Sequence, residues 1–433
     1  MADDRSSPPT AEPRAAARAV PGDPASIVVG ERLLDDLRTL RSFGATGTGV
    51  VRPSLSEVDL AARRWLRDRM ADAGLDATID GVGNVVGRST RPGPALLLGS
   101  HSDTQPTGGW LDGAYGVICG LEVARALGER PDTADLAVDV VAWVDEEATY
   151  LGCLGSRRFC GLLDDDEIER ASNADGVRLV DALAAAGLDG IGARHEPDRH
   201  IGYLEAHIEQ GANLEREGDR LGVVTTIVGT RTLDVTFTGQ QNHAGTTPMP
   251  LRRDAGMALV RFAAEADRAI GELRGPRTVW TVGRIDLHPG APSIIPGRGV
   301  LSLQYRDPDA DRLVAIDAAV ERVAVETTAA TGVEVEVTSP GRPIEPVAMD
   351  PGLIAHLQRA AEATAPGQAV AMPSAAVHDA MFVAEVMPAG MLFVPSIDGI
   401  SHDFAEDTAD DDLVLGAEAL AQAAAGILRD HRG

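Results

Sequence analysis

The sequence predicts an α/β protein in two parts. One is a larger domain, split along the chain, in which helices cover a mostly parallel sheet. The other is an inserted α+β domain with a four-stranded sheet and two helices. The chain has 433 residues, more than one hydrophobic core usually holds, so two lobes are expected. Residues 26–221 contain apolar runs separated by helical patterns, and the same kind of pattern resumes at residue 342. Between them, Thr- and Val-rich segments with partial alternation are typical of antiparallel strands.

In the first segment, helical and strand patterns alternate. Residues 56–74 have helical periodicity, with Ser56 as a candidate N-cap and Gly74 at the end. The run "GVGNVVGR" joins two β-like segments and indicates a hairpin. "PALLLGSH" and the Val-rich "LAVDVVAWVDEE" each predict a short buried strand, and the helical run "GVICGLEVARALGER" lies between them. Strands separated by helices favour a parallel sheet covered on both faces.

The inserted domain is expected over residues 222–341. Its strand patterns are "GVVTTIVGTRTLDVTFTGQQ", "RTVWTVGRIDLHP", "RGVLSLQYRD" and "GVEVEVTSPGR", with two helical runs between them. A helix, a strand and a last helix follow, so residues 342–433 complete the larger domain. Residues 1–25 contain Pro, Ala, Arg and acids but no apolar segment, which predicts a disordered tail and not a signal peptide.

The composition excludes several function classes. The formal net charge of −27 argues against nucleic acid and anionic membranes as partners, because both require a positive surface. No apolar run approaches the ~20 residues of a membrane span. The chain contains no lysine, which excludes Schiff-base chemistry and ordinary P-loop NTPase activity. Three cysteines without framework spacing fit a reducing cytoplasm.

Polar residues follow the strand "PALLLGSH". His101 and Asp103 are two residues apart, so they share a face of an extended chain. Open α/β sheets bind ligands at the carboxyl ends of their strands. A carboxylate often holds the second ring nitrogen of a metal-bound His, which suits Asp103, and Asp112 could be a direct ligand. Taken alone, this stretch fits an acidic turn as well as a metal site.

The second strand ends in three adjacent acids, Asp145, Glu146 and Glu147. On a surface loop they would be ordinary. Beside His101 they would supply a metal ligand and a general base, and metal-dependent hydrolysis requires both.

Three further histidines, His207, His243 and His402, lie near strand or loop ends beside glycine. A single such His is more often a structural residue than a ligand. Together with His101 they are harder to explain as independent structural residues.

These residues and their flanking motifs resemble the hydantoinase/carbamoylase branch of the M20 metallopeptidase-like family. That branch includes N-carbamoyl-L-amino-acid amidohydrolases, allantoate amidohydrolases, ureidoglycolate amidohydrolases and β-ureidopropionases. The motifs follow the family's order over about residues 90–405. They are "GSHSDTQPTGGWLDGAYGV", "DEEA" with a downstream "GSR", "HIEQG", "GVVTTIVGTR", "NHAGTTPMPLRRDA", "IIPG", "YRD", "HDAM" and "FVPSIDGISH".

The resemblance implies a binuclear amidohydrolase that cleaves a linear, non-peptide C–N bond of a small ureido- or N-acyl-carboxylate. It implies two divalent ions per subunit, Zn²⁺ or Mn²⁺. The implied ligands are His101, Asp112 and His207 for one ion, and Asp112, Glu147 and His402 for the other. Glu146 would be the general base, and Asp103 would lie behind the ligands.

The resemblance also implies a homodimer formed through the inserted lid or dimerisation domain. His243 on this domain would stabilise the oxyanion, reaching into the site of the other subunit. The implied substrate-binding residues are Gln210, His243, Ser293, Arg306 and His378, with Arg306 pairing with a substrate carboxylate.

Two departures from the family pattern bear on the substrate. The family usually has Asn where this chain has Ser293, and a hydroxyl is shorter with a single donor. The usual "SGAGHDAM" is "SAAVHDAM", so Ala375 and Val377 replace two glycines. Bulkier side chains there predict a reshaped pocket and a substrate other than the common N-carbamoyl amino acid.

Two alternatives remain open from the sequence. One is an aminoacylase or dipeptidase of the wider family. The other is a non-catalytic member, which would show a lost ligand or base, but all five ligand positions and Glu146 are present.

Overall fold

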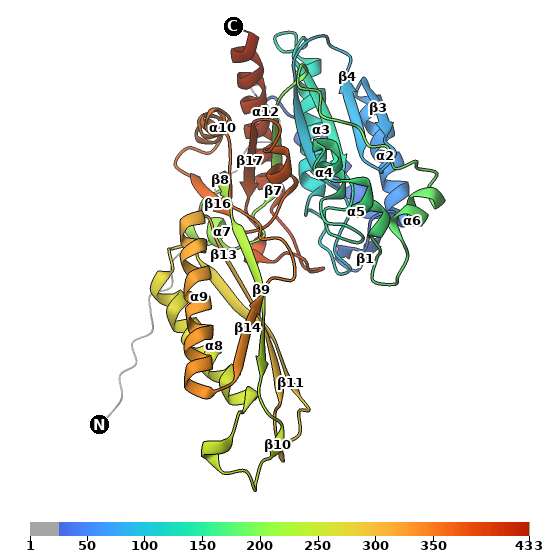
Figure 1. The fold of residues 1–433 in the computed structure, drawn as a ribbon. Coiled ribbons are helices and arrows are strands. Elements are labelled where there is room, and N and C mark those ends of the chain that lie inside the picture. Colours follow the sequence, from blue (N-terminus) through green and yellow to red (C-terminus); the bar gives the residue numbers. More distant parts are fainter. Residues whose placement is uncertain (1–25, 433) are drawn as a thin grey trace, which may run out of the picture.

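The computed structural model describes residues 26–432, so the predicted tail over residues 1–25 lies outside the described part. The chain forms a larger lobe built on a mixed sheet and a smaller lobe that projects from it (Figure 1). Within residues 26–432, no helix is both long enough and apolar enough to cross a membrane.

The larger lobe is built on a sheet of nine strands among the described residues. Their order is β15-β8-β17-β7-β5-β6-β4-β3, and β16 pairs with β8. The strands are β3 (Leu75–Ile79), β4 (Val85–Ser89), β5 (Ala95–His101), β6 (Ala137–Trp143), β7 (His200–Ile208), β8 (Leu221–Ile227), β15 (Val347–Ala348), β16 (Ala369–Ser374) and β17 (Ala389–Val394).

The predicted parallel sheet is confirmed at the centre. Strands β17, β7, β5 and β6 are parallel neighbours. At the flanks the pairing of β8 with β17, of β4 with β6 and of β3 with β4 is antiparallel, and β3–β4 is the predicted hairpin. Every residue of β5 and β6 is buried, because helices cover both faces.

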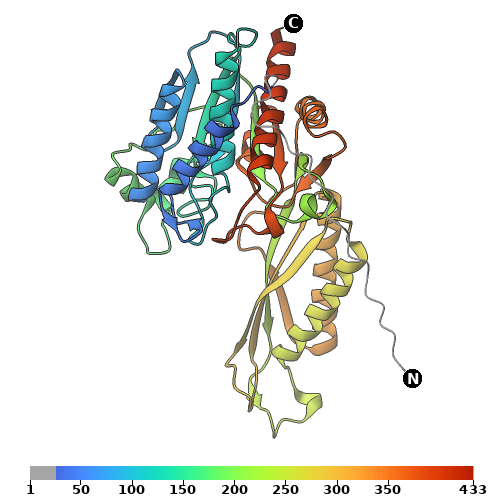
Figure 2. The same ribbon diagram turned by 180° about the vertical axis from the view of Figure 1, so that it is seen from behind.

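Alternate side chains of β5 enter two different hydrophobic clusters. Leu96 and Leu98 pack with α1 (Gly30–Ser42), α2 (Glu57–Asp72), α3 (Ala114–Glu129), α10 (Pro351–Thr364) and α12 (Asp410–Arg432). Leu97 faces the other way, toward α4 (Leu154–Cys160) and α11 (Asp379–Val383). Figure 2 shows the blue and teal helices and the red C-terminal helix together in front of the sheet. The remaining short elements of this lobe are β1 (Ala45–Thr46), β2 (Gly49–Val50), α5 (Asp165–Arg170), α6 (Leu179–Ala185), α7 (Asn213–Glu217) and η2 (Ile397–Gly399).

The smaller lobe contains the predicted four-stranded sheet and two long helices. Its sheet order is β11-β13-β9-β14, entirely antiparallel. Side chains from the sheet and both helices form one hydrophobic cluster, with Phe237, Phe262 and Ile316 fully buried. The elements are β9 (Gly229–Thr238), β10 (Asn242–His243), η1 (Met249–Leu251), α8 (Ala255–Leu273), β11 (Val279–His288), β12 (Ile294–Ile295), β13 (Arg298–Asp307), α9 (Ala310–Thr331) and β14 (Glu334–Thr338).

The smaller lobe begins later in the chain than the expected boundary at residue 222. Strand β8 covers Leu221–Ile227 and hydrogen-bonds to β17 and β16, so it belongs to the larger sheet. Only Val228 separates it from β9, which starts the smaller sheet. The same Thr- and Val-rich composition lies on both sides of Gly229, so the sequence pattern places the start of the smaller lobe too early.

Helix α3 lies very close to the central strands, and a glycine permits it. A Cβ on Gly116 would lie 2.3 Å from the carbonyl oxygen of Ala206 and 2.7 Å from Cβ of Ser100. The helix begins at Ala114, directly after the "WLDG" segment that carries Asp112. The close approach therefore fixes Asp112 above the ends of β5 and β7.

We expect Gly116→Ala to lower the free energy of unfolding by about 1–3 kcal/mol, because the new methyl group must displace the carbonyl oxygen of Ala206 on β7 and Cβ of Ser100 on β5. Chemical denaturation with a fluorescence or circular-dichroism readout measures the change. Gly271→Ala in α8 is the matched control, since a Cβ there meets no atom within 4 Å. It should be neutral or stabilise by up to ~1 kcal/mol. Equal effects of the two changes would contradict the close approach of α3.

Candidate functional site

Histidines and carboxylates gather where the central parallel strands end. His101 is the last residue of β5, and His207 lies on β7. The segments after β6 and β17 carry Glu147 and His402. Ligand atoms of two overlapping groups lie within 4.8 Å of one another. The groups are His101, Asp112 and His207, and Asp112, Glu147 and His402.

Asp112 connects the two groups. Its Oδ1 lies 3.4 Å from Nε2 of His101 and 3.1 Å from Nε2 of His207. Its Oδ2 lies 3.1 Å from Nε2 of His402, which is also 3.7 Å from Oε1 of Glu147. Ligands held ~2.0–2.2 Å from one Zn²⁺ are roughly 3–3.5 Å apart, so these spacings suit a divalent ion in each group.

Backbone carbonyls orient two of the histidines. Nδ1 of His101 lies 3.1 Å from the carbonyl oxygen of Asp103, and Nδ1 of His207 lies 2.8 Å from that of Ile208. Each carbonyl accepts the Nδ1 proton, which leaves the lone pair of Nε2 directed at Asp112. Gly113 allows this packing, because a Cβ there would lie 2.4 Å from the ring of His101.

The site concentrates negative charge in a buried place. Burial raises the pKa of Glu146 well above its ordinary value, although His101 opposes the shift. Burial and the charge of Asp112 raise the pKa of Glu147 to about 7. The hydrogen bond to Asp112 raises the pKa of His402 to about 9. A divalent cation would neutralise the same charge, and a donor set of nitrogen and oxygen atoms fits Zn²⁺ or Mn²⁺.

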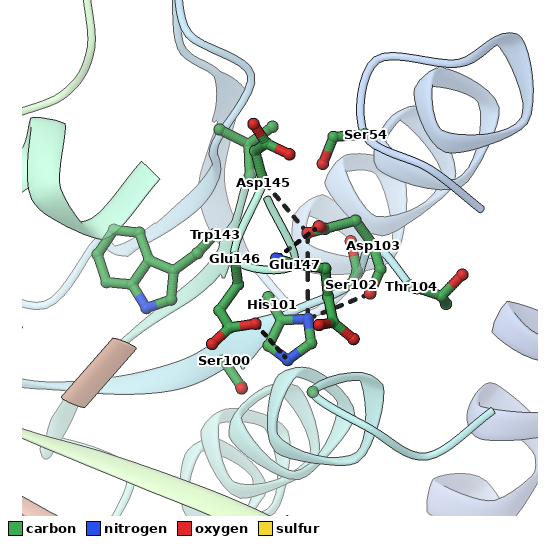
Figure 3. Close-up of polar contacts among 12 residues, drawn as sticks. Ser54, Ser100, His101, Ser102, Asp103, Thr104, Trp143, Asp145, Glu146 and Glu147 are labelled. Atoms are coloured by element: carbon green, nitrogen blue, oxygen red, sulfur yellow. Dashed lines mark hydrogen bonds and ion pairs between the residues drawn. The ribbon is translucent and has the colours of Figure 1, made fainter. Parts of the chain in front are cut away.

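Asp103 lies behind the site and holds the acidic loop that follows β6 (Figure 3). Its Oδ1 accepts the N–H of Asp145 at 3.1 Å, and its Oδ2 accepts the N–H of Glu147 at 3.3 Å. Asp145 points away from the ligand groups, and its carboxylate accepts three N–H groups of residues 149–151. Of the three adjacent acids, Asp145 therefore stabilises the loop, and the other two face the site.

Glu146 faces His101 across the site, with Oε2 3.8 Å from Nε2 (Figure 3). Its side chain is 10% exposed. The Cys153 thiol lies 3.8 Å from Oε1 of Glu146. A carboxylate with a raised pKa beside a cluster of ligands is suited to taking up a proton and releasing it again.

Gln210 contacts the ligand cluster directly, and Arg306 contacts the larger lobe from the smaller one. Nε2 of Gln210 donates to Oδ2 of Asp112 at 2.9 Å and lies 3.3 Å from Nε2 of His402. Arg306, near the end of β13, reaches the larger lobe and donates to the carbonyl oxygen of Ala375 at 2.8 Å. Its other nitrogens donate to Oε1 of Gln304. Burial lowers the pKa of Arg306, which has no carboxylate within 4 Å among residues 26–432.

His378 is 2% exposed, and its ring packs against the ring of His207. The two rings meet edge to face, with centroids 4.5 Å apart, and Nε2 of His378 lies 2.8 Å from Oγ of Ser374. Glu205, His207 and His378 form a third group of neighbouring ligand atoms, which the sequence analysis did not anticipate.

His243 and Ser293 lie apart from this cluster within one chain. His243 ends β10, which pairs with β12 directly after Ser293. The two residues are exposed at the far tip of the smaller lobe (Figure 1). The N–H of Ala244 donates to the carbonyl oxygen of Ser293 at 2.9 Å, so the paired segments β10 and β12 hold the two residues close together.

Two buried acids near the site escaped the sequence analysis. Oε1 of Glu406 accepts the N–H groups of Leu111 and Asp112 at 3.1 and 3.0 Å and thereby holds the loop before α3. Glu205 accepts a hydrogen bond from Ser100 at 2.6 Å beneath the histidines. Spacing offers a weak signal for each, since Glu406 follows His402 by four residues and Glu205 precedes His207 by two.

The comparisons with known proteins agree with this geometry. Residues 97–426 match the sequence model of peptidase family M20/M25/M40. An N-carbamoyl-L-amino-acid amidohydrolase of Paenarthrobacter aurescens is 37% identical over 90% of this chain and 95% of its own length. The allantoate amidohydrolase of Escherichia coli is 34% identical over 89% of this chain and 95% of its own length.

A solved structure extends the agreement to three dimensions. An amidase of the hydantoinase/carbamoylase family from Burkholderia phymatum superposes with a TM-score of 0.88 at 56% identity. The alignment covers 93% of this chain and 98% of that one. The chain therefore belongs to peptidase family M20/M25/M40, in its hydantoinase/carbamoylase branch.

Proposed function

We propose that the protein is a metal-dependent amidohydrolase that cleaves a linear, non-peptide C–N bond of a small ureido- or N-acyl-carboxylate. One observation carries the proposal: the Asp112 carboxylate lies between two nitrogen–oxygen ligand groups, and Glu146 faces them at 3.8 Å from His101. The substrates named for the relatives, N-carbamoyl amino acids and allantoate, share a ureido-type group and a carboxylate.

Two ions would be held at the site. His101, Asp112 and His207 would hold one, and Asp112, Glu147 and His402 the other, so the two groups would share Asp112. Bound metal would polarise the scissile carbonyl and lower the pKa of a water molecule. Zn²⁺ and Mn²⁺ both suit the donor set.

Glu146 would move the proton during hydrolysis. Its carboxylate would take a proton from the attacking water and deliver it to the leaving nitrogen, which must be protonated before it departs. Asp103 and the acidic loop would keep Glu146 opposite His101 during both transfers. Gln210, beside Asp112, would bind the ureido or amide group through its side-chain amide.

Arg306 would bind the substrate carboxylate. The chain has 66 acidic and 39 basic residues, so carboxylates outnumber cations. The Arg306 guanidinium is nevertheless half-buried without a carboxylate partner among residues 26–432, which leaves its positive charge available to a ligand. A planar guanidinium accepts a carboxylate through two parallel hydrogen bonds. The carbonyl of Ala375 already orients Arg306 toward the larger lobe.

We further propose a homodimer formed through the smaller lobe, in which His243 completes the site of the partner. Support comes from β11, which lies at the edge of its sheet, and from exposed apolar side chains on β11 and α8. These are Val279, Ile285, Met257 and Val260, each more than half exposed. His243 is remote from the cluster of its own chain, which also supports action across a dimer. The cytoplasmic setting stays a prediction.

Ammonia release tests the proposed reaction. Purified protein loaded with Mn²⁺ or Zn²⁺ is assayed on N-carbamoyl-L-amino acids, allantoate, ureidoglycolate and β-ureidopropionate, with N-acetyl amino acids followed by amine release. Metal-dependent ammonia from one ureido acid is the expected result. Amine release from N-acyl substrates alone would favour the aminoacylase alternative, and no product from any substrate, with metal bound, would contradict the proposal.

Asp112→Asn should reduce the amount of metal bound at both ion positions, because it removes the charge that the two groups share. Metal content after gel filtration, measured by mass spectrometry, gives the stoichiometry. Asp403→Asn is the control, since this acid lies beside His402 but is exposed and absent from both ligand groups. A wild-type stoichiometry in the Asp112 variant would exclude the shared-carboxylate arrangement.

Glu146→Gln should keep the metal and the fold while kcat falls by about 10²–10⁴-fold, because the amide cannot take up a proton. Metal content and the thermal midpoint are measured on the same preparation. A kcat within a few fold of wild type would remove Glu146 from the proton-transfer role.

Mixing two inactive variants tests action across the dimer. If His243 completes the partner's site, Glu146→Gln chains mixed with His243→Ala chains form one complete site in each mixed dimer. Random assortment makes half of the dimers mixed, so about a quarter of the wild-type activity should return. Each variant mixed only with itself is the control. No recovery after verified subunit exchange would place His243 outside the partner's site.

A further inference from the structure

Arg63 is a fully buried arginine that the proposed chemistry does not use. It lies on α2, and its side chain, like those of Asp59 and Asp103, has no exposed surface. Nε donates to Oδ2 of Asp59 at 2.8 Å, which is an ion pair within the helix. Burying a guanidinium is costly unless other groups satisfy it, so its remaining contacts indicate what it does.

Those contacts converge on the end of β6. Nη1 of Arg63 donates to the carbonyl oxygens of Trp143 and Gly83, each at 3.1 Å. Trp143 is the last residue of β6, two positions before the acidic loop begins at Asp145. Nη2 lies 3.7 Å from Oδ1 of Asp103. One side chain therefore contacts the strand that leads into the loop and the carboxylate that holds the loop.

The loop itself has a backbone that requires external support. Asp145 and Ala148 have φ values of 59° and 58°, in the left-handed region that disfavours residues with a Cβ. Asp103 binds the N–H groups of Asp145 and Glu147, on either side of Glu146. Any movement of Asp103 would therefore shift a ligand and the proposed base together.

We infer that Arg63 is a positioning residue for the metal centre, acting through Asp103 and the end of β6 to hold Glu146 and Glu147 opposite His101. The inference rests on the proposed function, since it assumes that the site binds metal. Arg63 does not touch the ligand groups, and neither the family resemblance nor the motifs assign it a role. Its effect passes through the ion pair with Asp103 and through hydrogen bonds to the end of β6, all behind the ligands.

Electrostatics and positioning predict opposite signs for a change at Arg63. Removing a positive charge 3.7 Å from Asp103 makes the surroundings more negative, which by Coulomb attraction alone would strengthen the binding of a cation. Loss of positioning would instead weaken binding, because ligands that move freely must be ordered when metal binds. The sign of the change in affinity therefore separates the two effects.

The experiment measures Mn²⁺ or Zn²⁺ affinity of the metal-free full chain by calorimetry for Arg63→Met and Arg63→Lys. We expect about 10- to 100-fold weaker binding for the Met variant and a smaller loss for Lys, which keeps the charge but not the fork of donors. Hydrogen exchange of residues 144–152 in the metal-free chain should become faster. At saturating metal, kcat should fall more than KM changes, because Arg63 does not contact the substrate.

Two controls separate positioning from general stability. Arg199→Met breaks another buried ion pair on the same strand, since Arg199 binds Asp139 of β6 at 2.7 Å. Arg64→Met alters the exposed neighbour on α2. Both should keep wild-type metal affinity and loop exchange. In an Asp103→Asn background, Arg63→Met should have a much smaller effect on affinity, because the carboxylate on which it acts is gone.

Unchanged or tighter metal binding by Arg63→Met would overturn the inference, as would an equal loss for Arg199→Met or full additivity with Asp103→Asn. If the Met variant does not fold, the Lys variant carries the test. If the wild-type chain binds no metal, the proposed function fails, and the exchange experiment still decides whether Arg63 holds the loop.

Discussion

The site depends on one carboxylate, that of Asp112, which is shared among three histidines. His101 and His207 come from neighbouring parallel strands and reach one oxygen, while His402 reaches the other. The arrangement requires the carboxyl ends of β5, β7 and β17 to lie side by side, and parallel pairing provides this. It also requires Asp112 to lie above those ends, which the close approach of α3 at Gly116 ensures. The parallel pairing of the strands and the packing of α3 therefore determine the geometry of the site together.

The candidate ligands could be found from the sequence because His101, Glu147 and His207 lie at or near strand ends, and the family motifs then implied the full set with Asp112 and His402. Arg63 could not be predicted, since "ARRW" gives no reason to bury Arg63 and expose Arg64. Burial there depends on the long-range packing of α2 against β6, which no local pattern records. The membership of β8 in the larger sheet was missed for a related reason. β8 and β9 have the same composition and are separated by one residue, so only hydrogen bonding distinguishes their sheets.

The two-lobed architecture divides the chemistry between rigid and peripheral elements. The ligand cluster lies on central strands that are buried on both faces. Arg306 on β13 of the smaller lobe contacts the larger lobe at the carbonyl oxygen of Ala375, whereas His243 and Ser293 lie at the exposed tip, away from the ligand cluster. In the proposed homodimer His243 of a second chain would complete the site, so the stability of the dimer and its activity would be linked. The apolar edge at β11 offers a surface for such an association.

The loops around the site hold backbone conformations that the chain would otherwise avoid. Asp145, Ala148, Gln210 and His402 are non-glycine residues with φ between 55° and 59°. Each such residue raises the free energy of the folded state by about 1 kcal/mol, so other contacts must hold the loops in this conformation. The Asp145 carboxylate accepts three N–H groups, and the N–H of Gln210 donates to Ser396 at 3.0 Å. These hydrogen bonds use groups outside the two ligand groups, so they hold the loop backbone without engaging the ligand atoms. The Arg63–Asp103 contact supports the same acidic loop from behind, and ligands held in this way need less ordering when an ion binds.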